Sequence, residues 1–290
     1  MGVLKQNLAE QAEFADIFRI QLLFEACGQR PESIALAQAL SQAFGDVEQV
    51  ADVEGSLTTY ALLDYPVTYA DNQKMPAQVL MANFAPFDSS QLDEMMLSQL
   101  WDCPNGEDLL KRCTHQLMIS DFLAAGLDYP LRCQMLTRWL ETALGLFEDC
   151  VAVWVPSSGK LLSREQVLNN PMSDGDRFIY WAVNVRFFQV DGSADKVIDT
   201  LGLYAIGLPD IQYHFRGLDP DAVVTHAYST ASYVFANNAP IASGETINGL
   251  KAGNIDSSVW WRCQYEMALI QPSREVMDVC PQGYAAGGRQ

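Results

Sequence analysis

The run at residues 199–219, DTLGLYAIGLPDIQYHFRGLD, constrains the fold more than any other stretch of this chain. Its apolar residues are interrupted by the turn GLPD at 207–210 and continue as an alternating pattern over 211–215. Apolar runs bounded by glycine and proline are typical of buried strands. The run therefore predicts a strand, a tight turn and a second strand that leads into a helix. It contains no nucleophile–base pair and no phosphate-binding loop.

The first half of the chain shows apolar periodicity that predicts the order β-α-β-β-α-β, followed by α-β. The first six elements match the ferredoxin-like motif, a small antiparallel sheet with helices on one face. The acidic segment 45–55 is expected to be a loop. The expected strands span residues 17–24, 57–69, 77–84, 115–119 and 151–155, and the expected helices begin near residues 34, 88 and 129.

The sequence pattern of the second half is different. It predicts strands rich in aromatic residues from residue 178 and a helix that starts at Asp219-Pro220. A chain of 290 residues is long enough for two domains of ordinary size. We therefore expect an α+β protein with two mixed α/β subdomains. The predicted parts are an N-terminal subdomain at 1–156, a polar connector at 157–177, and a C-terminal subdomain at 178–290 with a mostly antiparallel sheet, a helix and a frayed tail.

The charge balance narrows the choice of partner. Asp and Glu number 36 against 18 Lys and Arg, which gives a formal net charge of −18. Such a chain repels nucleic acid and anionic membranes and attracts basic surfaces. The sequence has neither a signal-peptide core nor an apolar run that could span a bilayer, so we expect a cytoplasmic protein.

Residue types that carry catalysis or bind metals form no recognisable motif. The seven cysteines are scattered without a CxxC, and most of them are expected to be reduced core thiols. The three histidines, His115, His214 and His226, lie outside metal-motif spacing. His226 falls opposite the apolar stripe of its expected helix, so we expect it to be exposed to solvent. No catalytic residue, cofactor or metal site is predicted.

Acidic residues cluster in two neighbouring segments of the first half. A solvated face is the ordinary explanation of such a cluster. Alternatively, carboxylates on a rigid scaffold can copy the charge spacing of nucleic acid and attract a basic protein. On this second interpretation, the predicted partner-binding residues are Asp46, Glu48, Asp52, Glu54, Asp88, Asp93 and Glu94.

Several short motifs resemble the bacterial family catalogued as domain of unknown function 4261. The motifs are IDTLGL at 198–203, GLPDIQ at 207–212, GETI at 244–247 and PSR at 272–274, with upstream similarity near Trp101, at 113–120 and at 151–154. The resemblance covers roughly residues 75–282. It implies a non-catalytic protein, and some members look like immunity proteins in bacterial toxin–antitoxin settings. It supplies no catalytic residue to carry over.

Three functional hypotheses follow. The first is a non-enzymatic immunity protein that binds and neutralises a basic toxin, such as a secreted nuclease. The second is an enzyme or small-ligand-binding protein with a pocket between the two halves, near Arg186, Asp210 and Tyr213. The third is a structural or regulatory module that associates with itself. The oligomeric state is not predicted.

Overall fold

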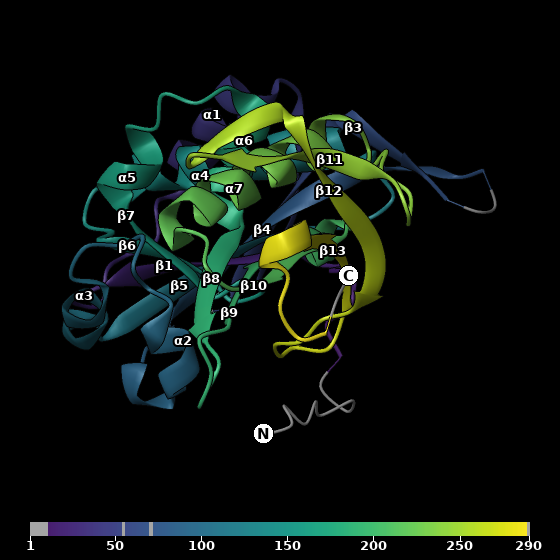
Figure 1. Cartoon of the computed structure of the whole chain (residues 1–290). Helices are drawn as coiled ribbons and strands as arrows, with labels where there is room; N and C mark the ends of the chain where they lie inside the picture. The colour runs from purple at the N-terminus through teal and green to yellow at the C-terminus, as the bar shows by residue number, and fades with distance from the viewer. Residues whose placement is uncertain (1–10, 54–55, 70–71, 289–290) are drawn as a thin grey trace. The chain divides into compact units, whose positions relative to one another are not determined.

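The computed structural model describes residues 11–53, 56–69 and 72–288 (Figure 1). The chain forms two compact units. The N-terminal unit lies within residues 15–182, and the described residues of the C-terminal unit are 11–14 and 183–288. The predicted connector at 157–177 therefore lies inside the N-terminal unit. It is not a linker, because it contains a strand at Lys160–Ser163, a helix at Arg164–Leu168 and the start of a helix at Asp174–Ala182.

The N-terminal unit is built on a seven-stranded sheet in the order β2-β3-β4-β5-β1-β6-β7, in which every neighbouring pair is antiparallel. Its strands are β1 (Arg19–Phe24), β2 (Val47–Val53), β3 (Leu57–Thr68), β4 (Lys74–Pro86), β5 (His115–Phe122), β6 (Ala152–Val155) and β7 (Lys160–Ser163). Its helices are α1 (Ser33–Phe44), η1 (Ser89–Gln91), α2 (Glu94–Ser98), α3 (Gly106–Arg112), α4 (Tyr129–Leu146), α5 (Arg164–Leu168) and α6 (Asp174–Ala182).

The α+β class predicted from the sequence is confirmed, but the N-terminal sheet differs from the ferredoxin-like pattern. Seven strands are present where that motif has four. Two of the additional strands, β2 and β7, form the edges of the sheet. β2 lies in the segment that we expected to be an acidic loop. An edge strand with one solvated side needs no apolar alternation, which explains why its sequence did not indicate a strand.

The core of this unit forms where α4 and α6 pack against the sheet. Pro130 stands in the first turn of α4, and the predicted stripe at 136–144 is buried. Residues 178–182 were expected to be a strand, yet they form the end of α6. Trp181 packs edge-on against Phe18 and donates a hydrogen bond from Nε1 to Thr137 on α4 at 3.1 Å. This segment is apolar because it is a buried helix.

The C-terminal unit contains a six-stranded sheet in the order β11-β12-β13-β10-β9-β8. Only β10 and β13 pair in parallel among the described strands of this sheet. Figure 1 shows β12 as a long, curved strand beside β11. The elements are β8 (Asn184–Gln189), β9 (Lys196–Leu201), η2 (Leu203–Ile206), β10 (Asp210–Phe215), α7 (Pro220–Ala236), β11 (Thr246–Lys251), β12 (Asn254–Met267), β13 (Glu275–Cys280) and η3 (Gln282–Tyr284).

The run at 199–219 folds as predicted, into the end of β9, a turn and β10 leading into α7. Gly207 adopts φ 83° at the end of the intervening η2 turn, a conformation that favours glycine. Asp219 caps α7 by accepting a hydrogen bond from the Asp221 N–H at 3.3 Å.

Both ends of the described chain are hydrogen-bonded within the C-terminal unit. Gln11 forms a parallel bridge with Ser273, and the Ala12 N–H donates to the Ser273 carbonyl at 2.8 Å. The predicted frayed tail is wrong as far as Ala286. Its backbone N–H donates to the carbonyl of His214 at 3.0 Å, because the tail pairs with the end of β10. None of the helices in the described ranges combines the length and apolarity needed to cross a bilayer.

Candidate functional site

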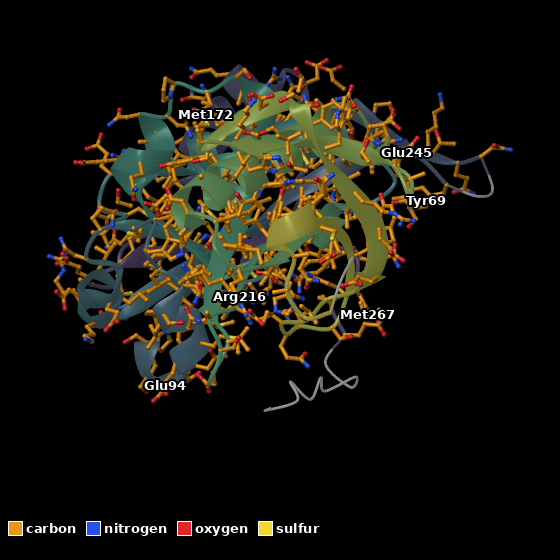
Figure 2. The ribbon with its side chains drawn as sticks, in the orientation of Figure 1. Tyr69, Glu94, Met172, Arg216, Glu245 and Met267 are labelled. Carbon is orange, nitrogen blue, oxygen red and sulfur yellow. The ribbon has the colours of Figure 1, made fainter. Side chains whose placement is uncertain are left out.

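A pocket of about 690 Å³ lies between α7 and β11 in the C-terminal unit. One wall is formed by residues 226, 229, 230 and 233 of α7, whose spacing places them on one face of the helix. The opposite wall comes from β11 and from Glu245, which immediately precedes it. Glu245 is among the side chains labelled in Figure 2. The volume lies within the roughly 300–1,000 Å³ that is usual for ligand sites. This pocket is our candidate functional site.

The floor of the pocket is a buried hydrogen-bond network around His226. Its Nε2 lies 2.7 Å from the carbonyl oxygen of Asn248, and because a carbonyl only accepts, Nε2 is the donor. In the neutral ring Nδ1 is then the acceptor, and the Tyr213 hydroxyl lies 2.8 Å from it. The Thr230 hydroxyl lies 3.2 Å from both groups. The network therefore fixes the imidazole through both nitrogens.

The expected exposure of His226 is wrong, since only 2% of the residue is accessible. β11 covers the side of α7 that the sequence pattern indicated as solvated. Burial lowers the pKa of His226 below its ordinary value of 6.5, although the bond to Asn248 acts in the opposite direction. Burial likewise raises the pKa of the Tyr213 hydroxyl well above its ordinary value. The floor is thus uncharged at neutral pH.

The predicted alternative pocket residues do not meet at one site. Arg186 and Asp210 belong to a buried ionic network, whereas Tyr213 points to the other face of β10, toward α7. Arg186 contacts both oxygens of Asp199, at 2.9 and 2.6 Å. Arg274 bridges Asp199 and Asp210, at 2.8 and 3.0 Å.

The two arginines and two aspartates of this ionic network are paired with one another. Asp210 Oδ1 also accepts hydrogen bonds from the Thr200 hydroxyl at 2.8 Å and from the Leu203 N–H at 3.1 Å. Burial raises the pKa of Asp210, and the Arg274 guanidinium acts against that shift. Buried charges that are mutually paired hold β8, β9, β10 and the start of β13 together. We assign Arg186 and Asp210 to this structural role.

The carboxylates predicted to bind a partner fall into two groups at opposite ends of the N-terminal sheet. Asp46, Glu48 and Asp52 are exposed on or beside β2, one edge strand. η1 and α2 carry the other group, and Met96 and Leu97 of α2 pack against the apolar cluster that includes Trp154 on β6 and Leu161 on β7. Glu54 lies outside the described residues. The six described residues therefore do not make one acidic face.

Asp88 and Asp93 act as helix caps. Asp88 accepts from the N–H and the hydroxyl of Ser90, at 3.0 and 2.7 Å, and these bonds lower its pKa. Asp93 accepts from the Met96 N–H at 2.7 Å, whereas Glu94 is exposed in the first turn of α2. The single helix expected from residue 88 is broken into η1 and α2, because each aspartate starts a separate turn.

Two ion pairs in the N-terminal unit have a buried basic side chain. Lys160, 1% exposed, forms an ion pair with Asp102, and burial lowers its pKa. Arg132 contacts Asp121 at 2.6 Å, and both are buried. Burial raises the pKa of the Cys150 thiol to about 12. No group of three or more His, Cys, Asp or Glu side chains in the described residues is placed to hold a metal ion.

Sequence reasoning missed two acidic residues that the structure places at potential interaction surfaces. Asp64, exposed on β3, lies beside Gly45 and so adds to the carboxylates at the β2 edge. Glu245 faces the pocket between α7 and β11. The alternating pattern of residues 57–69 could have indicated Asp64. Nothing local could have indicated Glu245, because the wall opposite it comes from α7.

Comparison with known families supports the resemblance read from the motifs. The family model described as "Domain of unknown function (DUF4261)" matches residues 199–280, which contain Asp199, Asp210 and Arg274 of the ionic network. The match begins downstream of the similarity near Trp101 and at 151–154. Searches of curated proteins and of solved structures found no match. Residues 199–280 of this chain are therefore similar to the DUF4261 family.

Proposed function

We propose that this protein is a non-enzymatic, cytoplasmic binding protein that captures and neutralises a basic protein partner. The observation that carries the proposal is the exposed acidic edge of the N-terminal sheet in a chain with a net charge of −18. Asp46, Glu48 and Asp64 lie exposed at this edge, and a positively charged surface is attracted to such a cluster over a distance of about a Debye length.

The edge also offers backbone groups to an extended segment. β2 has no neighbouring strand on its outer side among the described residues. Val50 and Val53 are 53% and 52% exposed there, beside the carboxylates. A partner strand that carries lysine or arginine can add to this edge through main-chain hydrogen bonds, with its charges selected by the acidic side chains. A bulge near Val50 restricts the register in which such a strand pairs.

The same carboxylates count against self-association through this edge. Two copies of β2 placed side by side would bring like charges together, which destabilises the pairing. The geometry therefore favours a basic partner over a second copy. Asp52 contributes less to the attraction of a basic partner. Its carboxylate lies 3.7 Å from the Arg30 guanidinium and accepts a hydrogen bond from the Thr58 hydroxyl.

We propose further that the basic partner is a toxin and that this protein confers immunity to it. The resemblance to the DUF4261 family supports this proposal. A nuclease is a suitable target because its nucleic-acid-binding surface is basic, and a protein with ordered carboxylates can cover that surface. The proposal predicts that a neighbouring reading frame encodes a large secreted protein with a basic, nuclease-like terminal domain, and such a domain is the test protein.

The experiment measures association of this protein with that purified terminal domain by stopped flow at 50 and 300 mM salt. For the Asp46→Asn/Glu48→Gln variant we expect an association rate roughly 3–10-fold lower at low salt, together with a weaker salt dependence. Glu94→Gln/Glu148→Gln is the matched control, since it removes two exposed charges away from β2. Equal rates for the three proteins would refute the β2 edge as the binding site. A terminal domain whose activity is unaffected by excess protein would refute neutralisation.

A further inference from the structure

The pocket between α7 and β11 has an unbalanced charge. Of its lining residues, Glu245 is the only charged one among the residues that the structure describes. One of its oxygens, Oε2, accepts a hydrogen bond from the Ala242 N–H at 2.7 Å. Within the described chain no lysine or arginine pairs with this carboxylate. The pocket therefore presents a net negative charge to whatever enters it.

The Ser229 hydroxyl adds an acceptor to the Glu245 carboxylate in the lining. Ser229 donates its hydroxyl proton to the Thr225 carbonyl at 3.0 Å, which leaves the lone pairs of its oxygen for a ligand. The His226 ring is neutral, and both of its nitrogens are bonded within the floor. A ligand that donates N–H groups is favoured here, and an anion is disfavoured.

The rim supplies an aromatic ring and aliphatic surface. Tyr233 is 50% exposed, and its ring lies one helical turn beyond Ser229 and Thr230. Ile255, 48% exposed, and Ile241, 7% exposed, also belong to the lining. A planar cation can stack on a phenol ring, and an alkyl stem can cover the isoleucines.

We propose that this pocket binds a guanidinium group carried on a short alkyl stem, as in arginine. The guanidinium pairs with Glu245 and stacks on Tyr233, while the stem lies against Ile255. Guanidinium is preferred over ammonium because it is planar, is weakly hydrated and offers several N–H donors in one plane. The ligand is either a free guanidinium compound or an arginine side chain of a protein. This inference rests on the C-terminal unit alone and stands apart from the β2 edge.

Two probes separate these sources: butylguanidinium, and the peptide Gly-Gly-Arg-Gly-Gly with blocked termini. Binding to the full chain is measured by titration calorimetry and by NMR shifts of the α7 and β11 amides. We expect saturable binding of at least one probe, weaker binding of butylammonium and none of butyrate. Binding of the peptide alone assigns the site to a protein arginine, and binding of butylguanidinium assigns it to a small molecule as well.

Variants locate the site. We expect Glu245→Gln to weaken probe binding at least 10-fold and Tyr233→Leu to weaken it several-fold. Glutamine at 245 retains an oxygen that accepts from Ala242, so the loop is preserved, and circular dichroism checks the fold. Glu275→Gln, an exposed charge on β13, is the matched control and should leave binding unchanged. The proposal is overturned if neither probe saturates, if butyrate binds as well as the cation, or if Glu245→Gln binds like the wild type.

Discussion

The phenol of Tyr213 donates a hydrogen bond to Nδ1 of His226 across 2.8 Å and so joins β10 to α7. Both side chains are almost completely buried, at 0% and 2% exposure. The imidazole in turn donates to the Asn248 carbonyl and thereby ties α7 to β11. One neutral histidine thus connects three elements that are distant in sequence. Its protonation state affects how stably the two walls of the pocket are joined.

Removing the Tyr213 hydroxyl tests this connection. Tyr213→Phe leaves the Thr230 hydroxyl, at 3.2 Å, as the remaining neighbour of Nδ1. We expect the free energy of unfolding to fall by about 1–2 kcal/mol, because a buried acceptor loses its best donor. Urea denaturation measures the loss. Tyr233→Phe is the control, since it removes an exposed hydroxyl, and a similar loss in both variants would contradict the network.

Acidification should weaken the protein through His226. The pKa of this histidine is lower in the folded protein than its ordinary value of 6.5, so the unfolded chain binds the proton more readily. The contribution of neutral His226 to the free energy of unfolding is complete above pH 6.5. It is lost as the pH falls toward the pKa of the folded state, and the free energy of unfolding then decreases by at most about 1.4 kcal/mol per pH unit.

The measurement compares free energies of unfolding at pH 7.5 and 5.5 for the wild type, His226→Gln and His115→Gln. We expect the pH-dependent loss to be smaller in His226→Gln than in the other two proteins. If His226→Gln retained the full wild-type dependence, another group would have to be responsible.

A larger loss in the free energy of unfolding is expected when the ionic network around Asp199 is disrupted. Asp199 has 0% exposure and contacts both Arg186 and Arg274. Asp199→Asn leaves two buried guanidinium groups with one carboxylate fewer, so we expect a loss of about 3–5 kcal/mol in the free energy of unfolding. Asp191→Asn, an exposed position between β8 and β9, should change it by less than about 0.5 kcal/mol. Equal unfolding midpoints in urea would show that the network contributes nothing.

Thiol chemistry should distinguish one cysteine from the rest. Cys27 is exposed, whereas Cys103, Cys113, Cys133, Cys150 and Cys263 are buried and Cys280 is half-buried. Burial raises the pKa of Cys113 to about 11 and that of Cys263 to about 12, so few thiolates form there at neutral pH. We expect a thiol reagent at pH 7.5 to label Cys27 first. Peptide mapping identifies the site, and Cys27→Ser should remove the fast phase.

Much of the fold was predictable because buried strands and helices carry strong apolar periodicity. The run at 199–219 and the helix at Tyr129-Pro130 follow their patterns. β2 was missed because an edge strand with exposed carboxylates has no such pattern, and the end of α6 was misassigned because a helix buried on most sides resembles a strand.

The candidate site was far less predictable. Its floor depends on contacts between Tyr213, His226 and Asn248, which come from three different elements. No spacing rule within one segment can bring them together. Arg186 and Asp210, predicted to line a pocket, instead form ion pairs inside the unit.

The bridge between Gln11 and Ser273 makes the order of synthesis relevant to folding. During translation the first described residues leave the ribosome long before Ser273 is synthesised, and residues 15–182 come in between. The unit that contains α7 and β11 therefore cannot form this bridge until Ser273 has been translated, whereas the other unit has its whole chain available earlier. A truncated product starting at residue 183 would lack the segment that pairs at Ser273.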